Sequence, residues 1–97
     1  MAKFSCGMLC ASRGVADTMA ENPAFAQFVN HSLARYLRGD WGEMSASDKQ
    51  SNDEAISSSG DLRIFAAYEY PGRKELKIWI ITEADRSATT VIFPSEY

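Results

Sequence analysis

The chain has 97 residues, of which 45% are hydrophobic and 24% are charged, a balance typical of one folded domain spanning 1–97 and not of a disordered chain. The formal net charge of −3 argues against a nonspecific DNA- or RNA-binding protein, because such proteins present a basic surface. No apolar run of about 18 residues predicts a membrane span, and the first residues lack a signal-peptide pattern, so we expect a cytoplasmic protein without membrane contact.

Residues 3–12 predict a first strand, and residues 13–20 predict a short helical turn. The strand holds both cysteines, Cys6 and Cys10. Four residues along a strand span about 13 Å, which is too far for a disulfide between them. A zinc site needs about four ligands, whereas the chain has two cysteines and one histidine. We therefore expect two reduced thiols, no metal and no cofactor.

A helix over about 23–38 is the clearest element of the sequence. Asn22 is a good N-cap, Pro23 suits the first helical position, and Gly39 stands where a left-handed C-cap glycine belongs. His31 falls on the polar face without a nucleophile that could be argued as its partner, so we expect no catalytic triad and no enzymatic activity. The residues that predict the buried face recur at helical spacing and are Phe25, Phe28, Val29, Leu33, Tyr36 and Leu37.

The segment 40–61 carries six acidic side chains and one basic side chain. Within it we expect a short surface helix over about 48–56, because Ser47 and Gln50 fit a capping box, and then a loop over 57–60. The acidic side chains either form a solvated surface or contact a basic surface on another protein. Trp41 also has two interpretations: exposed, it would anchor a partner, and buried, it would cover the core beside the helix end.

The last third of the chain has the alternating pattern of strands, over about 62–70, 76–83 and 89–93. Pro71 and Gly72 predict the first turn, and Pro94 ends the last strand. The fold class is therefore α+β: an antiparallel meander of three to four strands, packed by the helix over 23–38, with the short helix over 48–56 on the surface. A free edge at 89–93 or at the N-terminal segment would allow a homodimer through strand pairing.

The turn over 83–87 joins the last two predicted strands and carries Glu83, Asp85 and Arg86. Paired carboxylates can bind a metal or perform acid–base catalysis, but one short turn does not fix their separation. An ion pair between Asp85 and Arg86 that orders the turn is the simpler interpretation. Contact with a partner protein is the other.

Five blocks of the sequence become informative together: residues 13–15 (Arg-Gly-Val), 40–42 (Asp-Trp-Gly), Asp48 and Lys49 with Asn52, 77–87, and 89–97. Through them nearly the whole chain resembles a family of small plasmid-related proteins, which bacterial plasmids, phages and conjugative elements encode. The block over 77–97 is the most specific. Cys6 and Cys10 depart from the family's N-terminal strand, which further weakens a metal role. The resemblance implies a setting on a mobile element and no activity, so no catalytic residue follows from it.

Small accessory proteins of mobile elements often block host defences, including restriction and CRISPR nucleases. The hypothesis is therefore a binding protein that inhibits a host defence nuclease, with an anti-CRISPR protein that contacts the effector nuclease as its specific form. The alternative is an interaction or regulatory module for the element's own replication or transfer. The residues expected to contact the partner protein are Asp40, Trp41, Asp48, Asp53, Glu54, Asp85 and Arg86.

Overall fold

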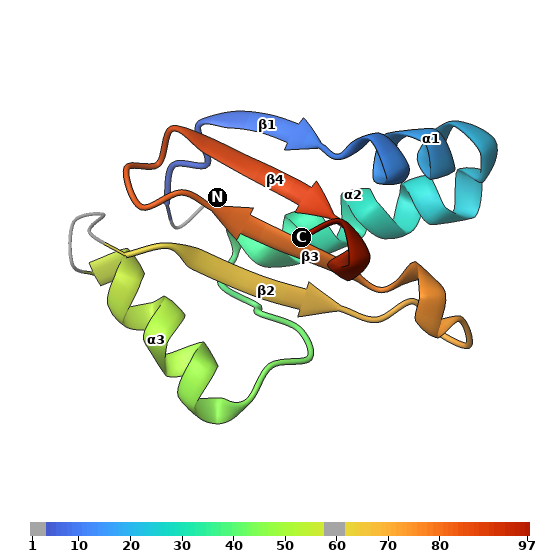
Figure 1. Ribbon diagram of the computed structural model, residues 1–97. Coiled ribbons are helices and arrows are strands. Elements are labelled where there is room, and N and C mark those ends of the chain that lie inside the picture. Colours follow the sequence, from blue (N-terminus) through green and yellow to red (C-terminus); the bar gives the residue numbers. More distant parts are fainter. Residues whose placement is uncertain (1–3, 58–61) are drawn as a thin grey trace.

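The computed structural model describes residues 4–57 and 62–97, so the start of the first predicted strand and most of the predicted loop over 57–60 lie outside the described residues. The fold is α+β, as expected, with α1 and α2 against one face of a four-stranded sheet and α3 beside β2 at the sheet's edge (Figure 1). The helices are α1 (Arg13–Glu21), α2 (Pro23–Leu37) and α3 (Ala46–Ser57), and the 3-10 turns are η1 (Lys74–Leu76) and η2 (Pro94–Glu96). The strands are β1 (Met8–Ala11), β2 (Ile64–Tyr68), β3 (Ile78–Thr82) and β4 (Ala88–Ile92).

The sheet has the strand order β1-β4-β3-β2, and its pairing corrects part of the prediction. Strands β2, β3 and β4 form the expected antiparallel meander. Strand β1 instead lies parallel to β4, because three α-helices and the strands β2 and β3 separate them in the chain and no short turn imposes the opposite direction. Strand β4 consequently has a neighbour on each side, so a free edge at 89–93 is wrong, whereas the alternative, an edge at the N-terminal segment, is confirmed for β1.

Helix α2 begins and ends as its sequence predicts. The Asn22 side chain accepts a hydrogen bond from the Phe25 amide at 3.1 Å, and Pro23 occupies the first turn. At the other end Gly39 has a φ of 83°, and its amide and the next one bond back to carbonyls of the last turn. This left-handed termination satisfies carbonyls that would otherwise lack partners, which explains why the helix stops after Leu37.

The core lies between the sheet and the helices α1 and α2. Phe25, Val29 and Tyr36 of α2 are fully buried, as predicted, whereas Phe28, Leu33 and Leu37 are half-buried at the margins. The residues facing them from α1 and the strands are Val15, Ile64, Ala66, Tyr68, Ile78, Ile80 and Val91. The buried α2 face also includes Ser32, whose hydroxyl finds no hydrogen-bond partner among the described residues.

A chain of buried hydroxyl groups joins α2 to the sheet and to the N-terminal segment. The Tyr36 hydroxyl lies 2.7 Å from Thr82 Oγ1, which lies 2.7 Å from Thr89 Oγ1. Thr89 Oγ1 in turn donates to the Cys6 carbonyl at 2.7 Å, which fixes the segment leading into β1. Burial raises the pKa of Tyr36, so this phenol stays protonated and able to donate.

Helix α3 starts two residues earlier than predicted, and its cap is a different serine. Ser45 Oγ accepts a hydrogen bond from the Asp48 amide at 3.2 Å, whereas Ser47 lies inside the helix. The predicted capping box of Ser47 and Gln50 is therefore wrong, because the spacing of three residues fits Ser45 and Asp48 equally well and the local pattern does not choose between them.

Candidate functional site

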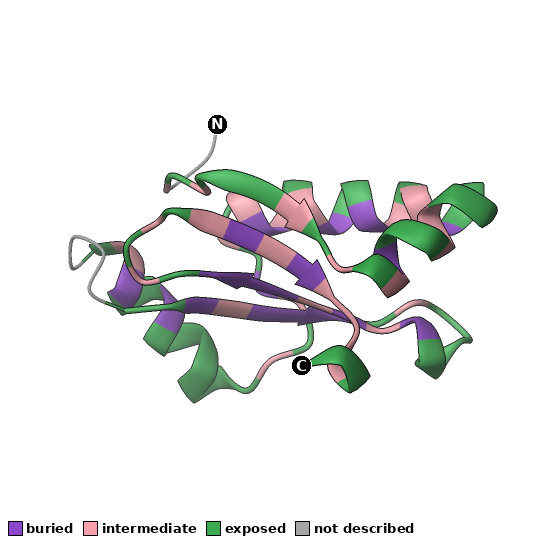
Figure 2. Ribbon diagram, turned by 45° about the horizontal axis from the view of Figure 1, so that its top comes forward, coloured by how far each residue is buried: buried purple, intermediate pink, exposed green. Residues whose placement is uncertain are grey.

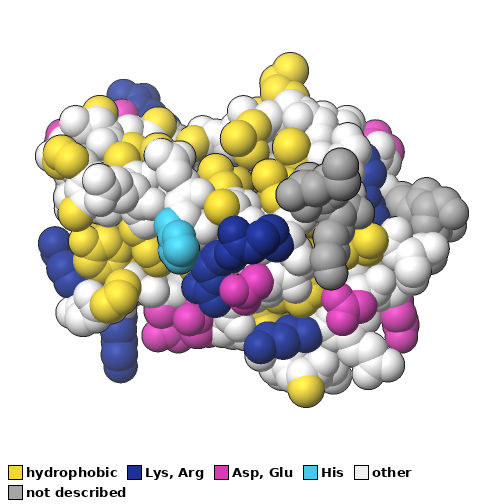
Figure 3. Space-filling model, turned by 180° about the vertical axis from the view of Figure 1, so that it is seen from behind, with side chains coloured by type: hydrophobic (Ala, Val, Ile, Leu, Met, Phe, Trp, Pro, Cys, Tyr) yellow, Lys and Arg dark blue, Asp and Glu magenta, His cyan; other side chains and the backbone are white. Residues whose placement is uncertain are grey.

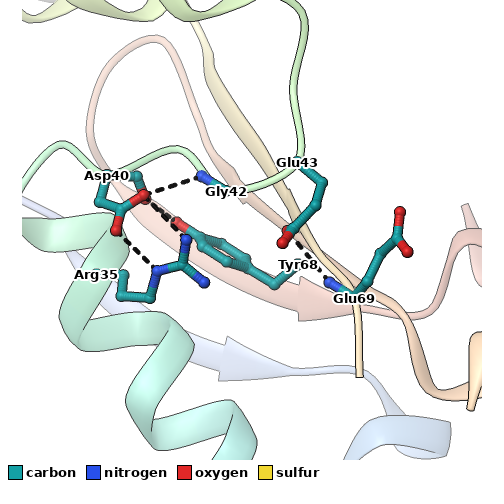
Figure 4. Close-up of polar contacts among 6 residues, drawn as sticks. All are labelled: Arg35, Asp40, Gly42, Glu43, Tyr68 and Glu69. Carbon is teal, nitrogen blue, oxygen red and sulfur yellow. Dashed lines mark hydrogen bonds and ion pairs between the residues drawn. The ribbon is translucent and has the colours of Figure 1, made fainter. Parts of the chain in front are cut away.

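Asp40 lies in a polar cluster that fastens the end of α2 to β2 (Figure 4). The Arg35 guanidinium donates two hydrogen bonds to the Asp40 carboxylate, at 2.8 and 3.1 Å. The Tyr68 hydroxyl donates to the Asp40 carbonyl at 2.6 Å, and the Gly42 amide donates to the carboxylate at 3.3 Å. The bonds from Arg35 hold the pKa of Asp40 below its usual value. Most of the hydrogen-bonding capacity of Asp40 is thus used within the chain.

Gly42 and Glu43 continue this attachment along the outer edge of β2. The Glu43 amide donates to the Ala67 carbonyl at 2.8 Å, and the Glu43 carboxylate accepts from the Glu69 amide at 3.3 Å (Figure 4). Gly42 has a φ of 71°, and a Cβ there would lie 2.3 Å from the Ala67 carbonyl oxygen. Only glycine therefore fits this approach, which explains Gly42 in the Asp-Trp-Gly block.

Trp41 is buried, with 3% of its surface exposed, so the second of its two interpretations is the correct one. Its ring packs edge-on against Tyr36, with ring centres 5.5 Å apart. Its indole N–H donates to the Asp53 carboxylate at 3.0 Å, which joins the segment after α2 to the middle of α3. Asp53 therefore has a structural role, because its carboxylate accepts the hydrogen bond of the buried Trp41 indole.

The carboxylates of α3 do not form one acidic face. At about 100° of rotation per residue, Asp48 lies about 140° around the helix from Asp53 and about 120° from Glu54. All three side chains are exposed. A single basic partner surface would therefore meet only part of this set, and Asp61 lies outside the described residues.

Asn52 of α3 has a structural role that its sequence did not predict. Its side-chain amide donates to the Phe65 carbonyl at 2.6 Å and accepts from the Phe65 amide at 3.2 Å. These two bonds are the pair that a neighbouring strand would make, so Asn52 closes the outer edge of β2 against further strand pairing. The signal in the sequence was an uncharged polar residue one turn before Ala55, the other buried residue of α3.

Arg86 does not form the expected ion pair with Asp85. One guanidinium nitrogen donates to the carbonyls of Leu62, Glu83 and Ala84, at 2.7, 3.2 and 3.1 Å. The other donates to the Ala55 carbonyl in the last turn of α3, at 2.9 Å. The predicted pair is wrong because unpartnered carbonyls of a helix end and a turn surround the cation, whereas the Asp85 carboxylate accepts from the Ser87 amide.

Replacing Asp40 with asparagine tests the role of the Arg35 pair. The folded pKa of Asp40 is lowered from the usual 3.8, so the pair stabilises the folded state above that value and its contribution is lost as the pH falls through the folded pKa. The pair is partly exposed, so we expect the Asp40→Asn variant to lose up to about 1 kcal/mol of unfolding free energy at pH 7. Urea unfolding should show the difference between the two proteins shrinking as the pH falls below 3.8, and a constant difference across pH would contradict this account.

One apolar feature of the surface is the face of the sheet opposite α1 and α2, which no described α-helix covers (Figure 1). We call it the uncovered sheet face and define it by Phe65, Trp79, Ile92 and Tyr97. The ring centres of Phe65 and Trp79 lie 5.0 Å apart, and those of Trp79 and Tyr97 lie 5.6 Å apart, both edge-to-face. Tyr97 is 69% exposed. Arg63 at the margin donates to the Tyr97 hydroxyl at 3.2 Å.

The strand positions on this face carry no charge; they are Met8, Cys10, Phe65, Ala67, Trp79, Ile81, Ala88, Thr90 and Ile92. An aromatic row with an arginine at its margin has the composition that protein interfaces favour. None of the residues expected from the sequence to contact a partner lies among these positions. The signal was present in the sequence, because β3 is apolar on both faces.

A hollow lies on the other side of the molecule. It has a volume of about 640 Å³ and is lined by Ala24, Gln27, Phe28, His31, Tyr70 and Pro71. No carboxylate, lysine, serine or cysteine lines it, so His31 has no partner there for nucleophilic catalysis. Figure 3 shows the histidine beside hydrophobic side chains, with basic and acidic groups interspersed over the rest of this view.

Two further classes of site are absent from the described residues. In residues 4–57 and 62–97, no three side chains of the His, Cys, Asp or Glu type are grouped so that they could hold a metal ion. Within the same ranges, no helix has both the length and the apolar character needed to cross a membrane.

No family model, curated protein or solved structure matches the chain. The site must therefore be interpreted from its own geometry.

Proposed function

We propose that this protein acts by binding another protein through the uncovered sheet face, and that it has no catalytic activity of its own. The observation that carries the proposal is the row of Phe65, Trp79 and Tyr97 on a sheet surface without charged strand positions. Large aromatic side chains bury much area at a small cost in side-chain entropy, which is why they dominate binding energies.

The partner that we propose is a host defence nuclease, specifically the effector of a CRISPR system, and the protein acts in the cytoplasm as its inhibitor. Support for this setting comes from the resemblance to small plasmid-related proteins of mobile elements. The net charge of −3 favours contact with protein over contact with DNA or RNA. Three of the residues expected from the sequence are exposed and remain candidate contacts outside the aromatic row: Asp48, Glu54 and Asp85. The side chains of the other four form hydrogen bonds within the chain: Asp40, Trp41, Asp53 and Arg86.

The test is transformation of cells that carry an active type II CRISPR system, using a targeted and an untargeted plasmid. We expect the chain to restore transformation by the targeted plasmid by at least about tenfold, and the Tyr97→Glu variant to lose most of this effect, because it places a charge on an apolar contact surface. His31→Ala, which changes an exposed residue on the opposite side, is the matched control and should behave as the wild type. Equal transformation with and without the chain would remove this inhibitor class.

The alternative is an interaction module for the replication or transfer of the element that encodes the chain. It uses the same face and differs only in the partner. Co-purification with and without the element's other genes separates the two proposals: a partner encoded on the element favours the alternative, and a chromosomal nuclease favours the inhibitor.

A further inference from the structure

The two edges of the sheet are treated differently by the rest of the chain. Along β2, the outward backbone groups are occupied by Asn52, the Glu43 amide and the Glu43 carboxylate. Along β1, no described residue bonds to the outward backbone of Leu9 or Ala11. Figure 2 shows β1 exposed along most of its length, whereas the other three strands are largely buried or half-buried. The protein thus closes one sheet edge and leaves the other open.

The open edge has none of the features that discourage pairing with another strand. Met8 is 70% exposed and Leu9 is 54% exposed. Residues 4–12 include no charged side chain and no proline, which are the usual protections of a free edge. The edge is also held in place: Gly7, with a φ of 61°, lies against the backbone of Arg86 and Ser87, so that a Cβ there would lie 2.3 Å from the Arg86 carbonyl oxygen. The edge is therefore apolar, neutral and pre-positioned.

We propose that β1 pairs antiparallel with β1 of a second copy of this chain, around a two-fold axis through Cys10. The amides of Met8 and Ser12 donate to β4, at 3.0 and 2.9 Å. By alternation along the strand, the N–H and C=O groups of Leu9 and Ala11 point away from the sheet. Pairing Leu9 of each copy with Ala11 of the other uses all of these groups in four hydrogen bonds. This register follows from the backbone alone.

The symmetry of the edge favours a second copy over an unrelated strand. An edge without charge does not favour a partner of opposite charge. Pairing around a two-fold axis gives a hydrogen-bond partner to the same outward N–H and C=O groups of both chains. The dimer would join two four-stranded sheets into one and extend the uncovered sheet face across both copies.

The register makes a chemical prediction. Cys10 of each copy forms the central, non-hydrogen-bonded pair, where Cα atoms lie about 4.5 Å apart and side chains share one face. That separation suits a disulfide. Oxidised glutathione would take two electrons from the two Cys10 thiols, forming one S–S bond and releasing two reduced glutathione molecules. Cys6 lies outside β1 and has no such counterpart.

The first experiment measures mass in solution by light scattering. We expect the wild type to have twice the chain mass of 10.8 kDa, and Leu9→Pro to be monomeric with an unchanged circular dichroism spectrum. The Leu9 amide points outward, so proline there blocks pairing with the second copy without removing a bond to β4. Leu9→Ala is the matched control and should remain a dimer. A monomeric wild type at about 100 μM, a concentration at which association of micromolar affinity would be saturated, overturns the proposal.

The second experiment identifies the register. With oxidised glutathione, wild type and Cys6→Ser should form a covalent dimer, and Cys10→Ser should not. A covalent dimer that depends on Cys6 and not on Cys10 overturns the proposal. A monomer whose Leu9 and Ala11 amides become protected from hydrogen exchange only when another protein is added would assign the edge to that protein and overturn it as well.

Discussion

Replacing Arg86 with methionine is expected to lower the free energy of unfolding by about 2 to 3 kcal/mol. The half-buried guanidinium serves four carbonyls, and a hydrogen bond from a charged donor contributes about 1 kcal/mol or less where it is exposed and more where it is partly buried. Methionine keeps most of the apolar stem of arginine and removes the donors. Arg86 bonds to the carbonyls of Leu62, at the start of the segment leading into β2, and of Ala55, in the last turn of α3. Losing these two bonds therefore also loosens the end of α3. Urea unfolding followed by tryptophan fluorescence measures the change.

Two further variants separate the side chain of Arg86 from its backbone. Arg86 has a φ of 62°, which disfavours every residue except glycine. Arg86→Gly removes the same hydrogen bonds but relieves this strain, so it should be more stable than Arg86→Ala by about 1 kcal/mol. Arg73→Met, which changes an exposed arginine paired with Glu75, is the matched control and should change stability by less than about 0.5 kcal/mol. An Arg86→Met protein as stable as this control would contradict the role of Arg86.

Replacing Asn52 with leucine should lower the free energy of unfolding by about 2 to 3 kcal/mol. Both backbone groups of Phe65 lose their partner in this variant, and each unsatisfied buried group costs about 1 kcal/mol or more. The freed edge should also promote self-association, because β2 would then offer unpaired N–H and C=O groups. Urea unfolding gives the first quantity, and light scattering over time gives the second.

Asn52→Asp is the sharper variant, because it keeps the shape of asparagine and loses only the amide donor. At pH 7 its carboxylate would face the Phe65 carbonyl oxygen at the 2.6 Å position and repel it, which raises the pKa of the new carboxyl group. A raised folded pKa means that stability is regained as the pH falls toward 4 and is lost as the pH rises through the folded value. Gln50→Leu, on the exposed side of α3, is the control. A pH-independent Asn52→Asp protein would refute the bidentate contact.

The elements that the sequence predicted well are those whose determinants are local. Helix α2 has a capping asparagine at one end and a glycine at the other, and both act as expected. The turn at Pro71 and Gly72 also holds, since the Arg73 amide bonds to the Tyr70 carbonyl and Gly72 has a positive φ. These features need only a few consecutive residues, so a single sequence contains them.

The features that the sequence did not predict depend on residues far apart in the chain. The direction of β1 depends on its pairing with β4, about 80 residues away. The four acceptors of Arg86 and the Phe65 partner of Asn52 are backbone groups, which have no residue-specific signal. The uncovered sheet face was not predicted, because an apolar strand face has the same pattern whether a helix or a partner protein covers it.

The central claim is that the uncovered sheet face binds a partner protein, and the most direct test is the affinity of the purified chain for the purified type II effector nuclease. Calorimetry should show a saturable complex, with the dissociation constant of Tyr97→Glu at least about tenfold higher, a difference of about 1.4 kcal/mol. His31→Ala should bind within about twofold of the wild type. No complex with the nuclease, or equal affinities for Tyr97→Glu and His31→Ala, would contradict the account.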